Sequence, residues 1–299
     1  MIRETLLDIG GAPTRLLTSG PEDAPPLLFL HGFPESSLSW CGVMKALPEF
    51  RCLAFDQRGF GISRNPWPDL KGLAMPALLG DVAAVLDAGG SERVTLVGHD
   101  WGAAVAYAAA FALPHRIGRL VILNGVHPVL FQKALAAGGP QSAASQYIDW
   151  LRADGVEDTL RANNFEKLLG LFSAHMDMGW LTPELRAEYE REWSRPNAVE
   201  GMVSWYRVSP VEVAQPGAPI PLPAWAEAEM RVTMPHLLIW GLDDTALLPE
   251  AAEGLEALCE DLTRVELEGC DHWLHHQRPD AVARAIREWM SSRSSLGEA

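Results

Sequence analysis

The stretch LVGHDWGAAVA, residues 96–106, joins the end of a β-type run to the start of a helical pattern. Within it, Gly98-His99-Asp100-Trp101-Gly102 follows VTLV at 94–97 and precedes a helix that we expect to extend to Leu113. A strand, a tight turn between two glycines and a helix form the setting of a nucleophile elbow, G-x-S-x-G. An aspartate stands where the serine is expected. Asp100 is therefore a candidate nucleophile, and a simple N-cap of the helix is the alternative.

The helix after the elbow bears on the charge of Asp100. Free N–H groups and the positive end of the helix dipole lie at a helix N-terminus, and both favour a carboxylate. We therefore expect Asp100 to be ionised.

The composition indicates an ordinary globular protein. The chain has 299 residues, of which 48% are hydrophobic and 21% are charged, and a formal net charge of -15. This charge disfavours a nucleic-acid partner or an anionic membrane surface. The longest apolar run, 103–113, is shorter than the ~20 residues that span a bilayer, and MIRETLLDIGG lacks the features of a signal peptide. We expect a cytoplasmic protein whose four scattered cysteines are reduced and bind no zinc.

Short β-type runs alternate with helical patterns in the first and last parts of the chain. We expect strands at 27–30, 52–55, 94–97, 120–123, 236–240 and 264–267, an N-terminal hairpin from 5–9 and 14–18, and helices at 36–47, 73–89, 101–113, 251–258 and 279–290. This alternation predicts an α/β fold with a mostly parallel sheet covered by helices on both faces.

The middle of the chain follows a different pattern. Residues 127–229 contain no strand-like run but hold helical patterns at 145–152, 165–176 and 183–193 and a proline-rich passage at 209–225. We expect three segments, a core at 1–126, an inserted helical cap at 127–229 and the rest of the core at 230–299.

Two segments near the C-terminus supply an acid and a histidine. The run HLLIW leads into Asp243 and Asp244, and the last strand leads into His272. An acid next to a histidine holds the imidazole tautomer and offsets its positive charge. We select Asp244 over Asp243, and His272 over His275 and His276 because it follows the last strand.

Taken together, these segments resemble the α/β-hydrolases, and specifically their soluble epoxide hydrolase branch. The resemblance spans almost the whole chain and rests on HGFPES (31–36), DQRGFG (56–61), VGHDWG (97–102), WGLDD (240–244) and DHW (271–273). It implies the α/β-hydrolase fold, with an eight-stranded sheet and an inserted cap.

The resemblance also implies roles for individual residues. Asp100 would be the nucleophile, His272 the base and Asp244 its partner. Some family members carry the acid after the sixth strand, where this chain has Asn124, and asparagine cannot replace it. The backbone N–H groups of Phe33 and Trp101 would form the oxyanion hole. We also expect a cis bond between Phe33 and Pro34, although a plain Gly-Pro turn is the alternative reading of HGFPES.

Epoxide hydrolases are similar to one another in placing two cap tyrosines over the nucleophile. Tyr147, in SQY at 145–147, and Tyr206, in SWYR at 204–207, match those contexts. Two tyrosines that only fill space are the alternative. Of the remaining two, we expect Tyr107 to be a packing residue and Tyr189 a surface residue.

These residue types predict the hydrolysis of an epoxide to a vicinal diol. A carboxylate that attacks a saturated carbon leaves an ester, which water activated by His272 can cleave, while two phenols can protonate the departing alkoxide. The chemistry requires no metal and no organic cofactor. We expect a small apolar epoxide and water as partners, no nucleic acid, no membrane, and a monomer or homodimer. The expected pocket residues are Phe33, Pro34, Trp101, Trp150 and Phe172, although a role in the core of the cap remains open for the cap residues.

Two other classes remain as alternatives. Haloalkane and fluoroacetate dehalogenases share the aspartate nucleophile and the tryptophan after it. Haloalkane dehalogenases often carry an asparagine after His-Gly, where this chain has Phe33. Fluoroacetate dehalogenases carry a Tyr-His-Trp cluster on the early cap helix, whereas Ile148 and Asp149 follow Tyr147 here. A non-catalytic binding protein on the same fold is the second alternative, and it would be favoured if a triad residue were missing.

Overall fold

The computed structural model describes residues 1–63, 70–173, 176–227 and 230–294, and an eight-stranded sheet forms its centre. The strands are β1 (Arg3–Ile9), β2 (Ala12–Ser19), β3 (Pro26–Leu30), β4 (Arg51–Phe55), β5 (Val94–His99), β6 (Ile117–Leu123), β7 (His236–Gly241) and β8 (Leu262–Leu267). Their order in the sheet is β1-β2-β4-β3-β5-β6-β7-β8. Pairing is antiparallel for β1 with β2 and for β2 with β4, and parallel for the remaining pairs. The expected N-terminal hairpin and mostly parallel sheet are confirmed.

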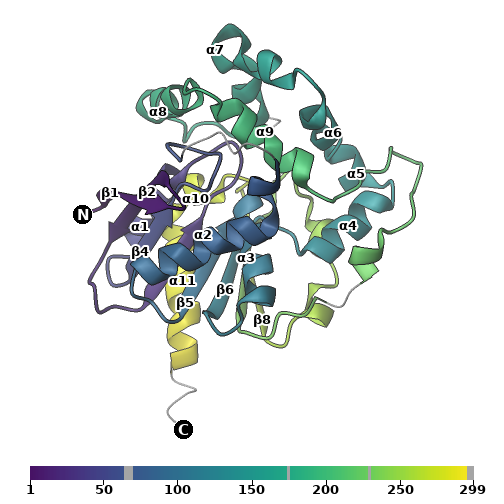
Figure 1. The fold of residues 1–299 in the computed structure, drawn as a ribbon. Helices are drawn as coiled ribbons and strands as arrows, with labels where there is room; N and C mark the ends of the chain where they lie inside the picture. Colours follow the sequence, from purple (N-terminus) through teal and green to yellow (C-terminus); the bar gives the residue numbers. More distant parts are fainter. Residues whose placement is uncertain (64–69, 174–175, 228–229, 295–299) are drawn as a thin grey trace.

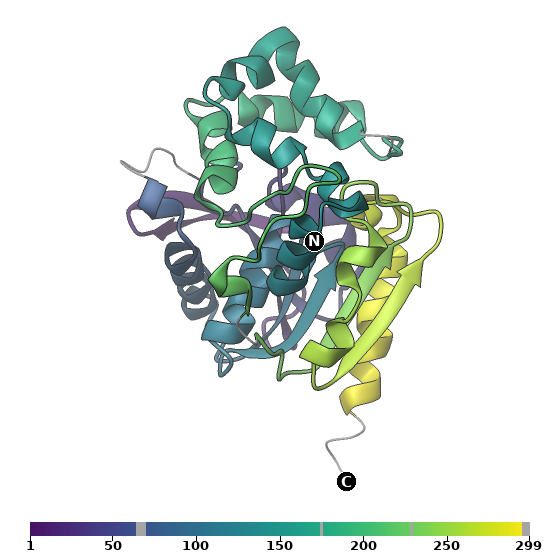
Figure 2. The same cartoon turned by 90° about the vertical axis from the view of Figure 1, so that its right-hand side faces the viewer.

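The helices form two groups, as Figure 1 shows. The core helices are α1 (Cys41–Ala46), α2 (Met75–Ala88), α3 (Trp101–Ala112), α10 (Leu274–Gln277) and α11 (Pro279–Ser294). Between β6 and β7 lie α4 (Pro128–Ala136), α5 (Pro140–Ala144), α6 (Tyr147–Arg152), α7 (Val156–Ser173), α8 (Pro183–Trp193) and α9 (Ala198–Val208). In Figure 2 the helices α5 to α9, in teal and green, lie as a layer above the sheet. None of the eight strands falls within the described part of 127–229.

Alternation along the central strands builds two apolar layers. Leu28 and Leu30 of β3 pack in one cluster with α2 and α3, while Leu27 and Phe29 pack in the other with α1 and α11. Successive side chains of a strand point to opposite faces, so a strand covered on both sides is apolar throughout. Because β3, β5, β6 and β7 run parallel, their carboxyl ends lie at one edge of the sheet, below the cap (Figure 2).

Several expected helices differ in detail. The helix expected at 251–258 consists of two 3-10 turns, η4 (Pro249–Ala252) and η5 (Leu255–Leu258), because Gly254 between them has φ +81°. The helix expected at 36–47 is likewise divided into η1 (Ser37–Trp40) and α1. The helix expected at 165–176 is the second part of α7, which follows a kink with non-helical backbone angles from Ala162 to Phe165 and ends at Ser173, while residues 174–175 lie outside the described residues.

Two short 3-10 turns complete the secondary structure, η2 (Leu70–Leu73) before α2 and η3 (Ala224–Glu227) before β7. Among the described residues, no helix combines the length and the apolar character needed to cross a bilayer.

Candidate active site

The elbow between β5 and α3 holds Asp100 in a conformation that few non-glycine residues adopt. Asp100 has φ +51°, a strained geometry of the kind that clusters at functional sites. The turn is tight because α3 approaches β3 closely, and a Cβ on Gly102 would lie 2.1 Å from the carbonyl oxygen of Leu30. The Asp100 side chain makes no capping hydrogen bond to α3, so the N-cap interpretation does not describe it.

The loop after β3 holds one oxygen of the Asp100 carboxylate. The backbone N–H of Phe33 donates to Asp100 Oδ1 at 2.7 Å, and the backbone N–H of Trp101 also donates to this carboxylate. Gly32 is required here, since a Cβ would lie 2.4 Å from Asp100 Oδ1. The bond between Phe33 and Pro34 is cis, as expected. The two N–H groups expected to form an oxyanion hole thus both bind the Asp100 carboxylate, and that of Phe33 binds Oδ1.

His272 lies between two carboxylates. Its Nδ1 is 2.8 Å from Asp244 Oδ2, and its Nε2 is 3.7 Å from Asp100 Oδ2. The second oxygen of Asp244, Oδ1, accepts from the backbone N–H groups of Ala246 and Leu247 at 2.8 and 2.9 Å. Both oxygens of Asp244 are therefore held, and the carboxylate orients the imidazole toward Asp100.

Asn124 supports this acid from the end of β6. Its Nδ2 donates to Asp244 Oδ2 at 2.6 Å, and its Oδ1 accepts from the backbone N–H of Gly241 at 2.7 Å. Sequence reasoning used Asn124 only to exclude an acid at that position. The structure assigns it a contact with the acid that the chain does have.

The pKa shifts of Asp100 and His272 differ from the expectation based on the helix dipole, which favoured an ionised Asp100. Burial raises the pKa of Asp100, opposed by His272 and by the N–H groups of Phe33 and Trp101. Burial alone would lower the pKa of His272, but Asp244 and then Asp100 outweigh it and raise that pKa to about 9. Each group thus affects the other, since His272 lowers the pKa of Asp100 against the effect of burial and Asp100 raises the pKa of His272.

Tyr147 of α6 and Tyr206 of α9 stand over the nucleophile. The Tyr206 ring contacts Trp101 and Phe33 edge-on, each at 5.1 Å between centroids, and its centroid is 6.2 Å from that of Tyr147. Burial raises the pKa of both phenols, and the negative charge of Asp100 adds to this effect. Both side chains therefore remain protonated and can donate hydrogen bonds.

A cavity of about 450 Å³ contains Asp100, Trp101, Tyr147 and Tyr206. The exposed fraction of the Asp100 side chain is 15%, so the carboxylate is open to the cavity although its surroundings are apolar. A volume of this size suits a small-molecule site.

Four expected pocket residues do not line this cavity. Phe172 lies in the hydrophobic core where the cap meets the sheet domain, packed against Trp180, Tyr189 and Trp193 of the cap and Trp273 of the core. Periodicity could not separate the cap core from a cavity wall, and Phe172 belongs to the core.

Trp150, Phe33 and Pro34 also lie outside the cavity wall. The Trp150 ring faces the ammonium of Lys167, and the carbonyl of Pro34 accepts from Trp193 Nε1 at 2.9 Å. Phe33 lies behind Tyr206, and only its backbone N–H reaches Asp100. Of the five expected residues, Trp101 alone lines the cavity.

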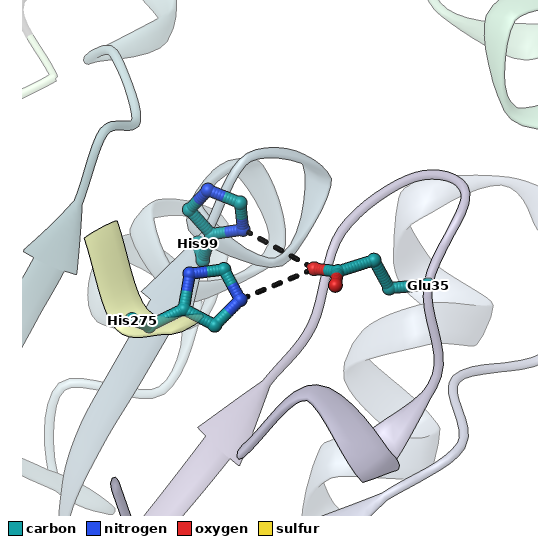
Figure 3. Close-up of side chains that lie close together, drawn as sticks. All are labelled: Glu35, His99 and His275. Atoms are coloured by element: carbon teal, nitrogen blue, oxygen red, sulfur yellow. Dashed lines mark hydrogen bonds and ion pairs between the residues drawn. The ribbon is translucent and has the colours of Figure 1, made fainter. Parts of the chain in front are cut away.

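A buried polar group that sequence reasoning missed lies next to the elbow. Glu35 follows the cis bond, and Figure 3 shows His99 and His275 directed at one of its oxygens. Oε2 lies 3.2 Å from His275 Nε2 and 3.9 Å from His99 Nδ1. The other oxygen, Oε1, accepts from Tyr189 at 3.0 Å and lies 2.6 Å from His276 Nε2. We call these five residues the Glu35 cluster.

The Glu35 cluster corrects the expectation for Tyr189, which is fully buried. Burial alone would raise the pKa of Glu35, but His276 and His275 outweigh it and hold that pKa well below its usual range. Ligand atoms of Glu35, His99 and His275 lie within 4.8 Å of one another, a spacing compatible with a cation. Tyr189, His275 and His276 already give both oxygens of Glu35 a hydrogen-bond partner. The position of Glu35 two residues after Phe33 was the only signal for it in the sequence.

Comparisons with known proteins agree with the geometry. A family model described as alpha/beta hydrolase fold matches residues 25–279. The AB hydrolase superfamily protein YfhM of Bacillus subtilis is 27% identical over 290 residues, which cover 96% of this chain and 97% of that protein. Human epoxide hydrolase 4 is 29% identical over 278 residues, 90% of this chain and 73% of that protein.

Solved structures share the whole architecture. A structure described under novel epoxide hydrolases of the alpha/beta hydrolases superfamily, from metagenomes of hot environments, has a TM-score of 0.88 and 35% identity, covering 97% of this chain and 99% of that one. The epoxide hydrolase of Bacillus megaterium in complex with an inhibitor has a TM-score of 0.84 and 27% identity, covering 96% and 100%. The similarity thus includes the cap as well as the sheet.

Proposed function

The chain belongs to the α/β-hydrolase-fold family, and from that membership and its site we propose that it hydrolyses epoxides to vicinal diols. The observation that carries the proposal is a carboxylate, held by two backbone N–H groups, that faces two protonated phenols across an apolar cavity. The names of its relatives support the same activity. In this proposal the helices of 127–229 serve as a lid that carries the phenols.

In the first step, Asp100 Oδ2 attacks an epoxide carbon. The new bond from Oδ2 to carbon forms as the carbon–oxygen bond of the ring breaks, and the ring oxygen takes a proton from the phenols. The N–H of Phe33 holds the other oxygen, Oδ1, and the N–H of Trp101 gives the carboxylate a second hydrogen bond, so its orientation is set before the substrate enters. The product of this step is an alkyl ester on Asp100.

In the second step, His272 acts as a base. Esterification removes the charge of Asp100, which is one of the charges that raise the pKa of His272. The imidazolium therefore gives up its proton, which replaces the one taken from the phenols. Neutral His272 then takes a proton from water as the oxygen of that water attacks the Asp100 carbonyl carbon.

Oδ1, the carbonyl oxygen of the ester in this proposal, already accepts from the N–H of Phe33, and the N–H of Trp101 lies beside the same carboxyl group. These donors stabilise the tetrahedral intermediate without further movement. Its collapse releases the diol, whose leaving oxygen takes the proton of the His272 imidazolium, and the Asp100 carboxylic acid then returns a proton to His272, which restores the ion pair.

The two phenols separate this function from dehalogenation. A departing halide stays unprotonated and needs only N–H donors around it, whereas the alkoxide from an epoxide needs a proton. Tyr147 and Tyr206 line the same cavity as Asp100 and remain protonated, which favours an oxygen leaving group.

A substrate panel tests the proposal. We expect diol from styrene oxide and from aliphatic epoxides, and no halide from chloro- and fluoro-carboxylates or haloalkanes. Release of halide without diol from any epoxide would instead identify a dehalogenase. If the protein converted none of these epoxides and halogenated compounds, the alternative of a non-catalytic binding protein would be favoured.

A trapping experiment tests the mechanism. In His272→Gln, the first step proceeds and the second does not, so intact-mass measurement should show a mass increase equal to one epoxide. The matched control is Asp100→Asn, which should gain no mass and lose about 10⁴-fold or more in turnover. An epoxide-sized mass increase on Asp100→Asn would place the nucleophile elsewhere.

A further inference from the structure

The cavity is elongated, and it follows one face of α3 away from the nucleophile. The α3 residues that line it are Trp101, Ala104, Ala108, Phe111 and Ala112, at helical intervals of three and four. With a rise of about 1.5 Å per residue, this row extends about 16 Å along the helix axis. The cavity therefore continues far beyond the space that an epoxide ring needs.

The solvent exposure of the side chains along α3 independently indicates the same cavity. Ala104 and Ala108 are half-buried, whereas Ala103, Val105 and Ala109 have no exposed surface. Near the far end, Ala112 is exposed, so the cavity reaches the surface there. We call this part of the cavity, from Ala104 to Ala112, the α3 channel.

The polar groups lie at one end of the cavity only. Asp100, Tyr147 and Tyr206 stand at the nucleophile end, and of the other described lining residues none is charged and only Ser209 has a hydroxyl. The facing walls are formed by apolar side chains that include Leu78 of α2 and Phe131 of α4. A charged substituent would lose its hydration in the channel without a partner, while a hydrocarbon would be stabilised there.

We propose that the substrate is an epoxide with one long apolar arm, which lies in the α3 channel, and that Ala104 and Ala108 determine the longest arm accepted. This inference rests on the proposed epoxide hydrolysis and adds the substrate class. The two alanines are suited to the role because their methyl groups leave the channel open. A larger side chain at either position would occupy the space of the arm, since the surrounding walls are packed.

A chain-length series of epoxides tests the proposal. In the wild-type protein, kcat/KM should rise about three- to fourfold per added methylene from 1,2-epoxybutane toward 1,2-epoxydecane, because each buried methylene contributes about that factor. The ratio of the values for the decane and butane epoxides is the measured quantity. A ratio near one in the wild type would overturn the proposal.

Two substitutions test where the apolar arm of the substrate binds. Ala108→Leu should lower the decane-to-butane ratio of kcat/KM at least tenfold. Ala104→Leu, which is closer to Asp100, should lower this ratio further, and kcat/KM should stop rising at a shorter chain length. The matched control is Ala187→Leu on the exposed face of α8, which should leave the ratio at its wild-type value. An unchanged ratio in Ala108→Leu would show that the arm lies elsewhere.

A binding experiment separates this inference from the proposed reaction. Unreactive primary alcohols from butan-1-ol to decan-1-ol should change the fluorescence of Trp101, Trp205 and Trp225, which line the cavity, with affinity that rises with chain length and falls in Ala108→Leu. This result without hydrolysis of any epoxide would keep the channel and reject the reaction. Epoxide hydrolysis with no dependence on length in either assay would keep the reaction and reject the channel.

Discussion

The charge of Asp100 couples to the protonation of His272. The imidazole Nε2 lies 3.7 Å from Asp100 Oδ2, and Asp244 holds Nδ1 at 2.8 Å. Two carboxylates thus stabilise one imidazolium inside a buried site. The reaction proposed above depends on this coupling, because the base must lose its proton once the ester has formed.

The coupling can be measured directly. We expect Asp100→Asn to lower the pKa of His272 from its value of about 9, because one of the two charges that raise it is removed. Titration of the His272 ring by NMR in both proteins checks this result. An unchanged pKa in Asp100→Asn would mean that esterification cannot convert His272 into a base.

The same pKa predicts how stability depends on pH. The folded-state pKa of His272, about 9, lies above its ordinary value of 6.5, so this group adds stability that is complete below about pH 6.5 and is lost as pH rises through 9. The shift corresponds to about 3 kcal/mol of unfolding free energy. Urea unfolding between pH 6.5 and 9.5 measures it. The Asp244→Asn variant should lose most of this pH dependence, and retention of the full dependence there would contradict the assignment.

At the scale of elements, the contact between α3 and β3 determines the position of Asp100, the proposed nucleophile. Helix α3 begins one residue after Asp100. Because Gly102 has no side chain, the backbone of α3 can pack directly against the backbone of Leu30. A nucleophile on a rigid turn keeps its orientation without help from the substrate. A glycine at position 102 is therefore a structural requirement of the elbow.

Two glycine substitutions test this contact. Gly102→Ala places a Cβ 2.1 Å from the backbone oxygen of Leu30, so we expect a loss of roughly 3 kcal/mol or more in unfolding free energy. The matched control is Gly80→Ala in the exposed middle of α2, where a Cβ meets nothing within 4 Å and should stabilise by about 0.5–1 kcal/mol. Denaturant melts compare the two variants. Equal effects would show that α3 can shift away from β3 at little cost.

At the scale of the whole molecule, buried polar contacts join the cap to the core through α8. Tyr189 donates to Glu35, and Glu192 pairs with Arg15, which also binds Asp56 at 2.9 Å. The indole N–H groups of Trp193 and Trp205 add hydrogen bonds to the backbone of the core, at Pro34 and Arg58. The position of α8 over the elbow therefore depends on groups that must remain paired.

A single hydroxyl tests the contribution of this contact. Tyr189→Phe removes one donor to the buried Glu35 carboxylate, so we expect a loss of about 1–3 kcal/mol and faster hydrogen exchange in α8. Tyr107→Phe is the control, because it removes a hydroxyl that contacts His236 Nε2 at 2.9 Å within the core. Exchange in α8 should stay slow in that variant. Equal exchange in the two variants would indicate that Tyr189 does not hold the cap.

The sequence by itself determined every strand of the sheet and the positions of Asp100, Asp244 and His272 at the ends of strands. Strand runs and the elbow are local patterns, because period-two burial and a turn between glycines are visible within ten residues. Asp100, Asp244 and His272 lie at the ends of parallel strands, so a correct strand order already brings them to one edge. The two cap tyrosines followed from family resemblance, and the structure places both at the cavity.

Only the tertiary structure decided which side chains face the cavity and which polar groups are buried between layers. Helical periodicity gives one apolar face to Phe172 and to Tyr147 alike, and long-range packing alone sends the first into the cap core and the second to Asp100. Tyr189 lies among charged neighbours in sequence and is buried because α8 packs over Glu35, 154 residues away. Such contacts depend on the docking of one layer on another, a property that no local stretch of chain contains.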